Sequence, residues 1–121
     1  MFEFGDLITM ETAKRSQWED LLRYYSEKNE GRATRLGVFE NGNDYWLEDG
    51  LLLTGLDIDA HAAAASVQIM LGRFTHTVRG VSHVTFHLSN DGNSDGFDVT
   101  DAEGRVAMLR FEKESRPTRL V

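Results

Sequence analysis

The chain has 121 residues and a mass of 13.7 kDa, the size of one domain with a single hydrophobic core. Its 20 Asp and Glu residues outnumber its 13 Lys and Arg residues, and the net charge is −7 at pH 7. Because this charge repels phosphate backbones and anionic lipid, we expect neither a nucleic-acid nor a membrane partner. The chain has no cysteine, which excludes disulfide bonds, thiolate metal sites and cysteine nucleophiles.

The two ends of the chain bear on its location. The stretch Met1–Asp6 lacks the basic start of a signal peptide, and no apolar run approaches the ~20 residues of a membrane-spanning helix. We therefore expect a cytoplasmic protein that forms one domain over residues 1–121. Residues 1–10 are interpreted as an N-terminal extension, and residues 115–121, which hold the only proline, as a frayed tail.

One amphipathic helix is predicted to begin near Ser16. Ser16 and Glu19 have the spacing of a capping box, in which each side chain satisfies a free backbone N–H group. An apolar stripe at helical spacing then follows, made of Trp18, Leu21, Leu22 and Tyr25. Asn29 and Gly31 are expected to end the helix, because glycine readily adopts the left-handed conformation found there.

The rest of the chain predicts strands joined by short turns. Strands are expected over 32–40, 45–47, 51–58, 66–71, 74–78, 82–88, 97–100 and 105–111. Turns are expected at 41–42, 48–50, 72–73, 79–80 and 101–104, and residues 60–65 are either one helical turn or a loop. The order predicts an α+β fold: one N-terminal amphipathic helix packed on a curved antiparallel sheet, a meander of about six or seven strands.

Several short blocks, in this order and spacing, resemble a bacterial family. They are Trp18–Glu30, Leu51–Leu56, Ile69–Gly72, Thr75–Val78, Asp101–Gly104 and Met108–Phe111. Over roughly residues 16–112 the chain is similar to domain-of-unknown-function family 5335. The resemblance implies a bacterial cytosolic origin and these domain boundaries, and it brings no activity with it. The segment Met1–Met10 and the alanine-rich stretch around His61 depart from the family pattern.

Three histidines lie in the predicted strands and invite comparison with a metal site. His83 and His87 share one strand face, but residues four apart on a strand lie about 13 Å apart, too far to share a zinc ion. We expect a hairpin with Phe74 opposite Phe86, which places His76 on the apolar side. The histidines are therefore predicted to be scattered, with His83 and His87 facing solvent and His76 hydrogen-bonded in the core or at its rim.

The segment 91–96 matches the first half of a calcium-binding loop. Asp91, Asn93 and Asp95 would supply the alternating oxygen ligands, and glycines permit the sharp turn. Ala102 occupies the position at which a bidentate glutamate is required. The two interpretations are a weak calcium site and an ordinary hairpin loop rich in turn-forming residues. No cofactor is predicted.

No catalytic residue is predicted, because neither a nucleophile elbow nor a phosphate-binding glycine loop occurs in the chain. The sequence favours a non-catalytic module that self-associates as a homodimer or docks to a protein partner. Phe2, Phe4, Tyr45 and Trp46 are the candidate interface residues. Phe2 and Phe4 are equally compatible with a strand that closes the chain's own sheet.

The alternative function is that of a small-ligand binder. A curved sheet beneath a helix would enclose an apolar pocket between the two. Its predicted lining is Phe74, His76, Phe86, Phe97 and Phe111.

Overall fold

The computed structural model describes residues 9–60, 63–88 and 94–112. The elements are β1 (Thr9–Thr12), the 3₁₀ turn η1 (Arg15–Gln17), α1 (Trp18–Asn29), β2 (Ala33–Glu40), β3 (Asn43–Asp59), β4 (Ala65–Leu71), β5 (Phe74–Leu88), β6 (Ser94–Asp101) and β7 (Val106–Phe111). The prediction of one helix followed by an antiparallel sheet is confirmed.

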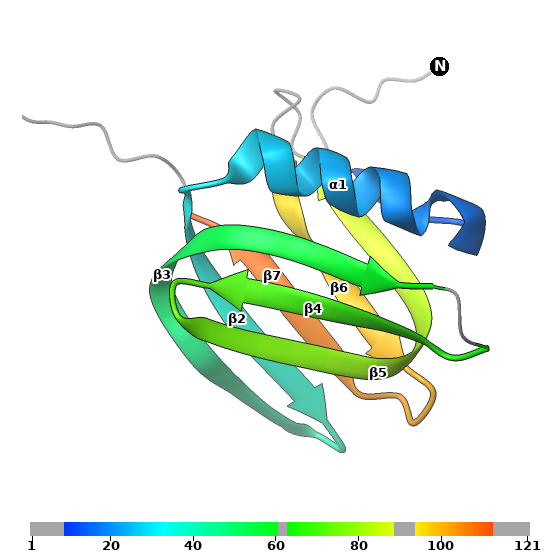
Figure 1. The fold of residues 1–121 in the computed structure, drawn as a ribbon. Helices are drawn as coiled ribbons and strands as arrows, with labels where there is room; N and C mark the ends of the chain where they lie inside the picture. The colour runs from blue at the N-terminus through cyan, green and yellow to red at the C-terminus, as the bar shows by residue number, and fades with distance from the viewer. Residues whose placement is uncertain (1–8, 61–62, 89–93, 113–121) are drawn as a thin grey trace, which may run out of the picture.

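The strands β2 to β7 form a closed antiparallel barrel (Figure 1). Each strand pairs with the next one in sequence, and β2 pairs with β7 to close the ring. The predicted meander is therefore present, but its closure into a barrel was not predicted. β1 pairs with the C-terminal end of β5, where Thr9 is opposite Leu88. The last residues of the predicted N-terminal extension thus pair with the chain's own sheet.

The predicted turn at 48–50 is wrong, because β3 runs through it as one strand. The register between β2 and β3 shifts here, from Arg35 opposite Asp49 to Ala33 opposite Leu52. Gly50 has φ 100, a backbone conformation that glycine adopts without strain. Positive-φ glycine serves both turns and strand bulges, so the sequence signal at this position was ambiguous.

The predicted break at 79–80 is wrong for the same reason, and β5 is one long strand. Gly80 has φ 66, and the register between β5 and β6 shifts just after it. The expected hairpin between Phe74 and Phe86 therefore does not exist. Phe74 lies opposite Leu71 of β4, and Phe86 lies opposite Phe97 of β6.

The helix closes one end of the barrel, and its predicted apolar stripe is confirmed. Trp18, Leu22 and Tyr25 are buried. The helical segment begins before the predicted capping box, at η1, where the Lys14 backbone N–H donates to Gln17 Oε1 at 3.2 Å. Ser16 thus lies inside the first turn and does not cap it.

Aromatic rings join the helix to the strands beneath it. The ring of Tyr25 lies 4.7 Å from Phe86, 6.1 Å from Phe97 and 6.2 Å from Phe111, between ring centroids. Its hydroxyl donates a hydrogen bond of 3.3 Å to the carbonyl of His87. Such tilted ring pairs bury a large apolar area. The end of the barrel beneath α1 is therefore filled by packed side chains of the hydrophobic core. In the part of the chain that the structure describes, no helix has the length and apolar character needed to cross a membrane.

Candidate functional site: the open end of the barrel

The end of the barrel opposite the helix carries a cleft of about 470 Å³. Strand β7 runs from the cleft to the helix. Ala107, near its N-terminal end, lines the cleft, whereas Phe111, at its C-terminal end, contacts Tyr25 of α1. Val38, Val78 and Ala107 provide a buried apolar floor. A cleft of this size lies within the range of about 300–1,000 Å³ that is typical of ligand sites.

Aromatic side chains form one wall of this cleft. The rings of Phe74 and His76 are nearly parallel, at an interplanar angle of 9° and a centroid distance of 6.5 Å. Burial lowers the pKa of His76 below its ordinary value of 6.5, so its ring is neutral at pH 7. Tyr45 lines the cleft from β3 and is 48% exposed.

The rim of the cleft is charged and lies on the β6–β7 hairpin. Asp101, which is 7% exposed, accepts hydrogen bonds from the backbone N–H groups of Glu103 at 2.9 Å and Arg105 at 3.0 Å. Arg105 Nε also donates to Asp101 Oδ2 at 2.8 Å. Burial alone would raise the pKa of Asp101, but these hydrogen bonds and the charge of Arg105 bring it below its ordinary value. The Asp101 carboxylate therefore stabilises the turn between β6 and β7, which the sequence predicts at residues 101–104.

One side of the cleft is bordered by an unpaired edge of β5. Thr54 Oγ1 of β3 donates a hydrogen bond of 3.0 Å to the carbonyl of Met70, so the backbone of Met70 in β4 faces β3. Met70 lies opposite Thr75 in the ladder between β4 and β5. In an antiparallel ladder such a pair exchanges no hydrogen bonds, so the N–H and C=O groups of Thr75 point away from β4.

The same alternation applies to Thr77 and Arg79, two and four residues further along β5. Their backbone groups also point away from β4, towards the side on which β6 pairs with the later part of β5. Pairing with β6, however, begins only at Val81. Among residues 9–60, 63–88 and 94–112, no backbone partner is found on this side for Thr75, Thr77 or Arg79. The unpaired stretch ends before Gly80, because the carbonyl of Gly80 accepts a hydrogen bond of 2.8 Å from the Ala102 N–H group. We call this stretch, Phe74–Arg79, the open edge.

A second unpaired edge borders the cleft from β3. Residues 43–51 of β3 pair with β2 alone, because contact with the β4 side begins at Leu52, whose carbonyl accepts a hydrogen bond from the Gly72 N–H group. Tyr45 and Leu47 from this half of β3 line the cleft together with residues of the open edge. The cleft therefore lies between two strand segments that each lack a neighbour on one side within the described residues.

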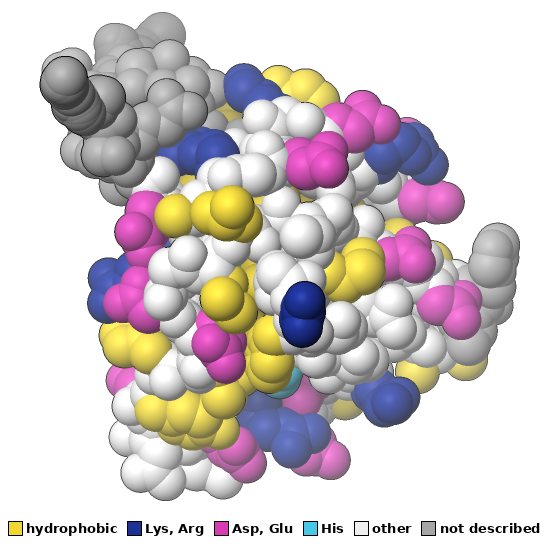
Figure 2. Space-filling model, turned by 60° about the vertical axis from the view of Figure 1, so that its left-hand side comes forward, with side chains coloured by type: hydrophobic (Ala, Val, Ile, Leu, Met, Phe, Trp, Pro, Cys, Tyr) yellow, Lys and Arg dark blue, Asp and Glu magenta, His cyan; other side chains and the backbone are white. Residues whose placement is uncertain are grey.

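Aromatic side chains are exposed on the hairpin beside the cleft. Trp46 is 46% exposed and lies over Gly37, where an added Cβ would come within 2.9 Å of the indole. The guanidinium of Arg35 lies 4.1 Å from the centroid of that indole, in a cation–π contact. Figure 2 turns this side of the molecule forward and shows hydrophobic patches interspersed with acidic side chains. Tyr45 and Trp46, predicted as interface residues, are thus both at the surface.

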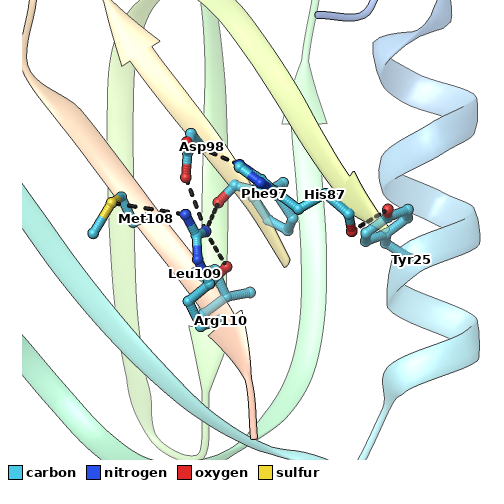
Figure 3. Close-up of polar contacts among 7 residues, drawn as sticks. All are labelled: Tyr25, His87, Phe97, Asp98, Met108, Leu109 and Arg110. Carbon is cyan, nitrogen blue, oxygen red and sulfur yellow. Dashed lines mark hydrogen bonds and ion pairs between the residues drawn. The ribbon is translucent and has the colours of Figure 1, made fainter. Parts of the chain in front are cut away.

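A polar cluster on the outer wall of the barrel links β5, β6 and β7 (Figure 3). His87 Nε2 lies 3.0 Å from Asp98 Oδ2, and Arg110 Nη1 lies 2.9 Å from Asp98 Oδ1. Arg110 also donates to the carbonyl of Leu109 at 3.0 Å. His87 is only 8% exposed, so the prediction that it faces solvent is wrong, whereas His83 is exposed as predicted. We assign this cluster a bracing role, because it joins three adjacent strands.

The five residues predicted to line one pocket do not lie together. Phe86, Phe97 and Phe111 belong to the core beneath the helix, whereas Phe74 and His76 line the cleft at the opposite end. The physical reason is the continuity of β5, since 12 residues of strand separate Phe74 from Phe86 by roughly 40 Å of chain. The space between helix and sheet is a groove of about 200 Å³ beside α1 and β3.

The other predicted site residues are placed only in part. Phe2, Phe4, Asp91 and Asn93 lie outside the described residues. Asp95 lies in β6 and is partly buried. Among the described residues, no group of three His, Asp or Glu side chains is arranged to hold a metal ion. The calcium site therefore stays a prediction.

Comparison of this chain with protein-family models, with curated proteins and with solved structures finds no match. The resemblance to domain-of-unknown-function family 5335 therefore stays a prediction.

Proposed function

We propose that the protein is a non-catalytic binding module that takes up an extended segment of a partner protein at the open end of its barrel. The observation that carries this proposal is the open edge, where three residues of β5 present backbone groups without a strand partner among the described residues. An extended segment pairs readily with such an edge, because each main-chain hydrogen bond forms irrespective of the side chains.

The cleft gives the segment a place for its side chains. Side chains of a strand alternate between two faces, so every second residue of the added segment would point towards Val38, Val78 and Ala107. Fully burying one Val or Leu side chain contributes roughly 1.5–3 kcal/mol. Backbone pairing would thus supply part of the affinity, and the apolar floor would select for apolar residues at alternate positions.

The exposed aromatic residues support a protein partner. Tyr45 lines the cleft, and Trp46 with its stacked Arg35 lies on the neighbouring outer face. Tyr, Trp and Arg are the residue types most enriched where protein interfaces concentrate their binding energy. We also propose a cytoplasmic location, in keeping with a chain that has no cysteine.

Two other occupants of the open end are distinguishable from a partner segment. In a homodimer, two open edges would pair antiparallel about Thr77, and light scattering would give twice the mass of 13.7 kDa. A small apolar ligand would fill the cleft of about 470 Å³ and leave the open edge unpaired. A partner segment predicts a monomer in solution whose edge becomes paired on binding.

The proposal is tested by selection from a random nine-residue peptide library displayed on phage. The recovered peptides are then measured for binding to the wild-type protein, Thr77→Pro and Thr77→Ala. Proline removes the N–H group that points out of the open edge and places its ring there, whereas alanine keeps the N–H group. We expect Thr77→Pro to weaken binding at least tenfold and Thr77→Ala to change it less than threefold.

Thermal unfolding shows whether both variants remain folded, as expected for substitutions at an unpaired edge. If the library yields no binding peptide, or if folded Thr77→Pro binds the recovered peptides as tightly as wild type, strand addition at β5 is incorrect.

A further inference from the structure

We infer that the partner segment carries acidic side chains at both ends of the stretch that pairs with the open edge, where they form ion pairs with Arg73 and Arg79. This inference rests on the proposed function and adds the chemistry of the partner. It comes from the charges that flank the open edge.

Arg73 and Arg79 stand apart from the other arginines of the described residues. Four of those, Arg23, Arg35, Arg105 and Arg110, form ion pairs with Asp or Glu side chains. Arg15 and Arg32 donate side-chain hydrogen bonds to backbone carbonyls. For Arg73 and Arg79, no side-chain hydrogen bond or ion pair is found in the described part of the chain. Both arginines are exposed and their positive charges have no ion-pair partner among the described residues.

Both arginines flank the open edge. Arg79 is exposed on the outer face of β5 and borders the cleft, and Arg73 is exposed in the turn that precedes β5. Six residues separate them, which corresponds to roughly 20 Å of extended chain. A segment paired with Phe74–Arg79 would therefore have one end near Arg79 and the other near Arg73.

The alternation of side chains along β5 predicts which residue types the partner segment carries at each position opposite Arg73–Arg79. Residues opposite Phe74, His76 and Val78 would face the cleft and be apolar, because β5 side chains alternate and these three line it. Acids inside the cleft are disfavoured by Glu40 and by the Asp101 carboxylate, which is already paired with Arg105. The expected pattern is acidic, apolar, any, apolar, any, apolar, acidic.

The test uses two fluorescein-labelled peptides of defined sequence. One is Gly-Glu-Val-Thr-Val-Thr-Val-Glu-Gly, and the other has Lys in place of both Glu residues. Fluorescence polarisation measures their binding to the wild-type protein and to the double variant R73E/R79E. The double variant K14E/K28E, at two exposed lysines beside η1 and in α1, is the matched control because it changes the net charge by the same amount as R73E/R79E.

We expect the wild type to prefer the Glu peptide about tenfold and the double variant to reverse this preference. The K14E/K28E control should keep the wild-type preference. Raising the salt from 0.05 to 0.5 M should reduce the preference, because these arginines are exposed.

Failure of the inference is distinct from failure of the proposed function. If the wild type binds both peptides equally and Thr77→Pro abolishes both, the acidic pattern is wrong and strand addition stands. A preference for Glu that persists in R73E/R79E likewise contradicts the role of these arginines. If neither peptide binds the wild type, both the inference and strand addition of this alternating pattern are overturned.

Discussion

Replacing Gly96 by alanine is expected to lower the free energy of unfolding by roughly 3–5 kcal/mol, a large part of the total for a domain of this size. Gly96 has φ 147, a conformation that residues with a Cβ rarely adopt. A Cβ at this position would overlap the carbonyl oxygen of Leu109 and come within 3.0 Å of Arg110 Cα. Because Gly96 pairs with both β5 and β7, neither strand can shift without disturbing the barrel. Chemical denaturation followed by circular dichroism measures the change.

Gly104→Ala is the matched control. Gly104 also has a positive φ, 88, but a Cβ there meets no atom within 4 Å. It should therefore cost only the backbone strain, about 1 kcal/mol. Equal losses for the two variants would show that the close approach of β6 to β7 does not exist.

Phe97→Ala is expected to destabilise the protein by about 3–5 kcal/mol. Phe97 is 0% exposed, and its ring lies 5.8 Å from that of Phe86 and 6.1 Å from that of Tyr25. Its removal would leave a cavity where helix and barrel meet. Denaturation of Phe39→Ala provides the comparison, since Phe39 is 37% exposed and should cost less than 1.5 kcal/mol. A similar loss for both variants would contradict the position of the core.

The local elements were predictable because their signals lie within a few residues. The apolar stripe from Trp18 to Tyr25 predicts the buried face of α1, and alternating residues predict most strands. Closure of the barrel depends instead on β2 pairing with β7, about 70 residues further along the chain, and no local signal reports such a contact. Gly50 and Gly80 misled the prediction because a bulge and a turn both use positive φ.

The candidate site was predictable only in part. Exposure of Tyr45 and Trp46 was expected from their short segment between turn signals, and both are exposed. The predicted pocket joins Phe74 and Phe86 because the sequence predicts a break at 79–80, whereas β5 is continuous there. The same predicted break conceals the open edge, because a turn at Arg79 leaves no continuous strand at that position to border a cleft.

Amide hydrogen exchange along β5 tests the central claim most directly, because it reports which N–H groups are bonded. In the free protein we expect slow exchange at Phe74, His76 and Val78, whose groups face β4, and fast exchange at Thr75, Thr77 and Arg79. Adding the Glu peptide should slow the second set, whereas a small molecule in the cleft would leave it fast. Slow exchange at all six amides of the free protein would show that the edge is already paired and would contradict the account.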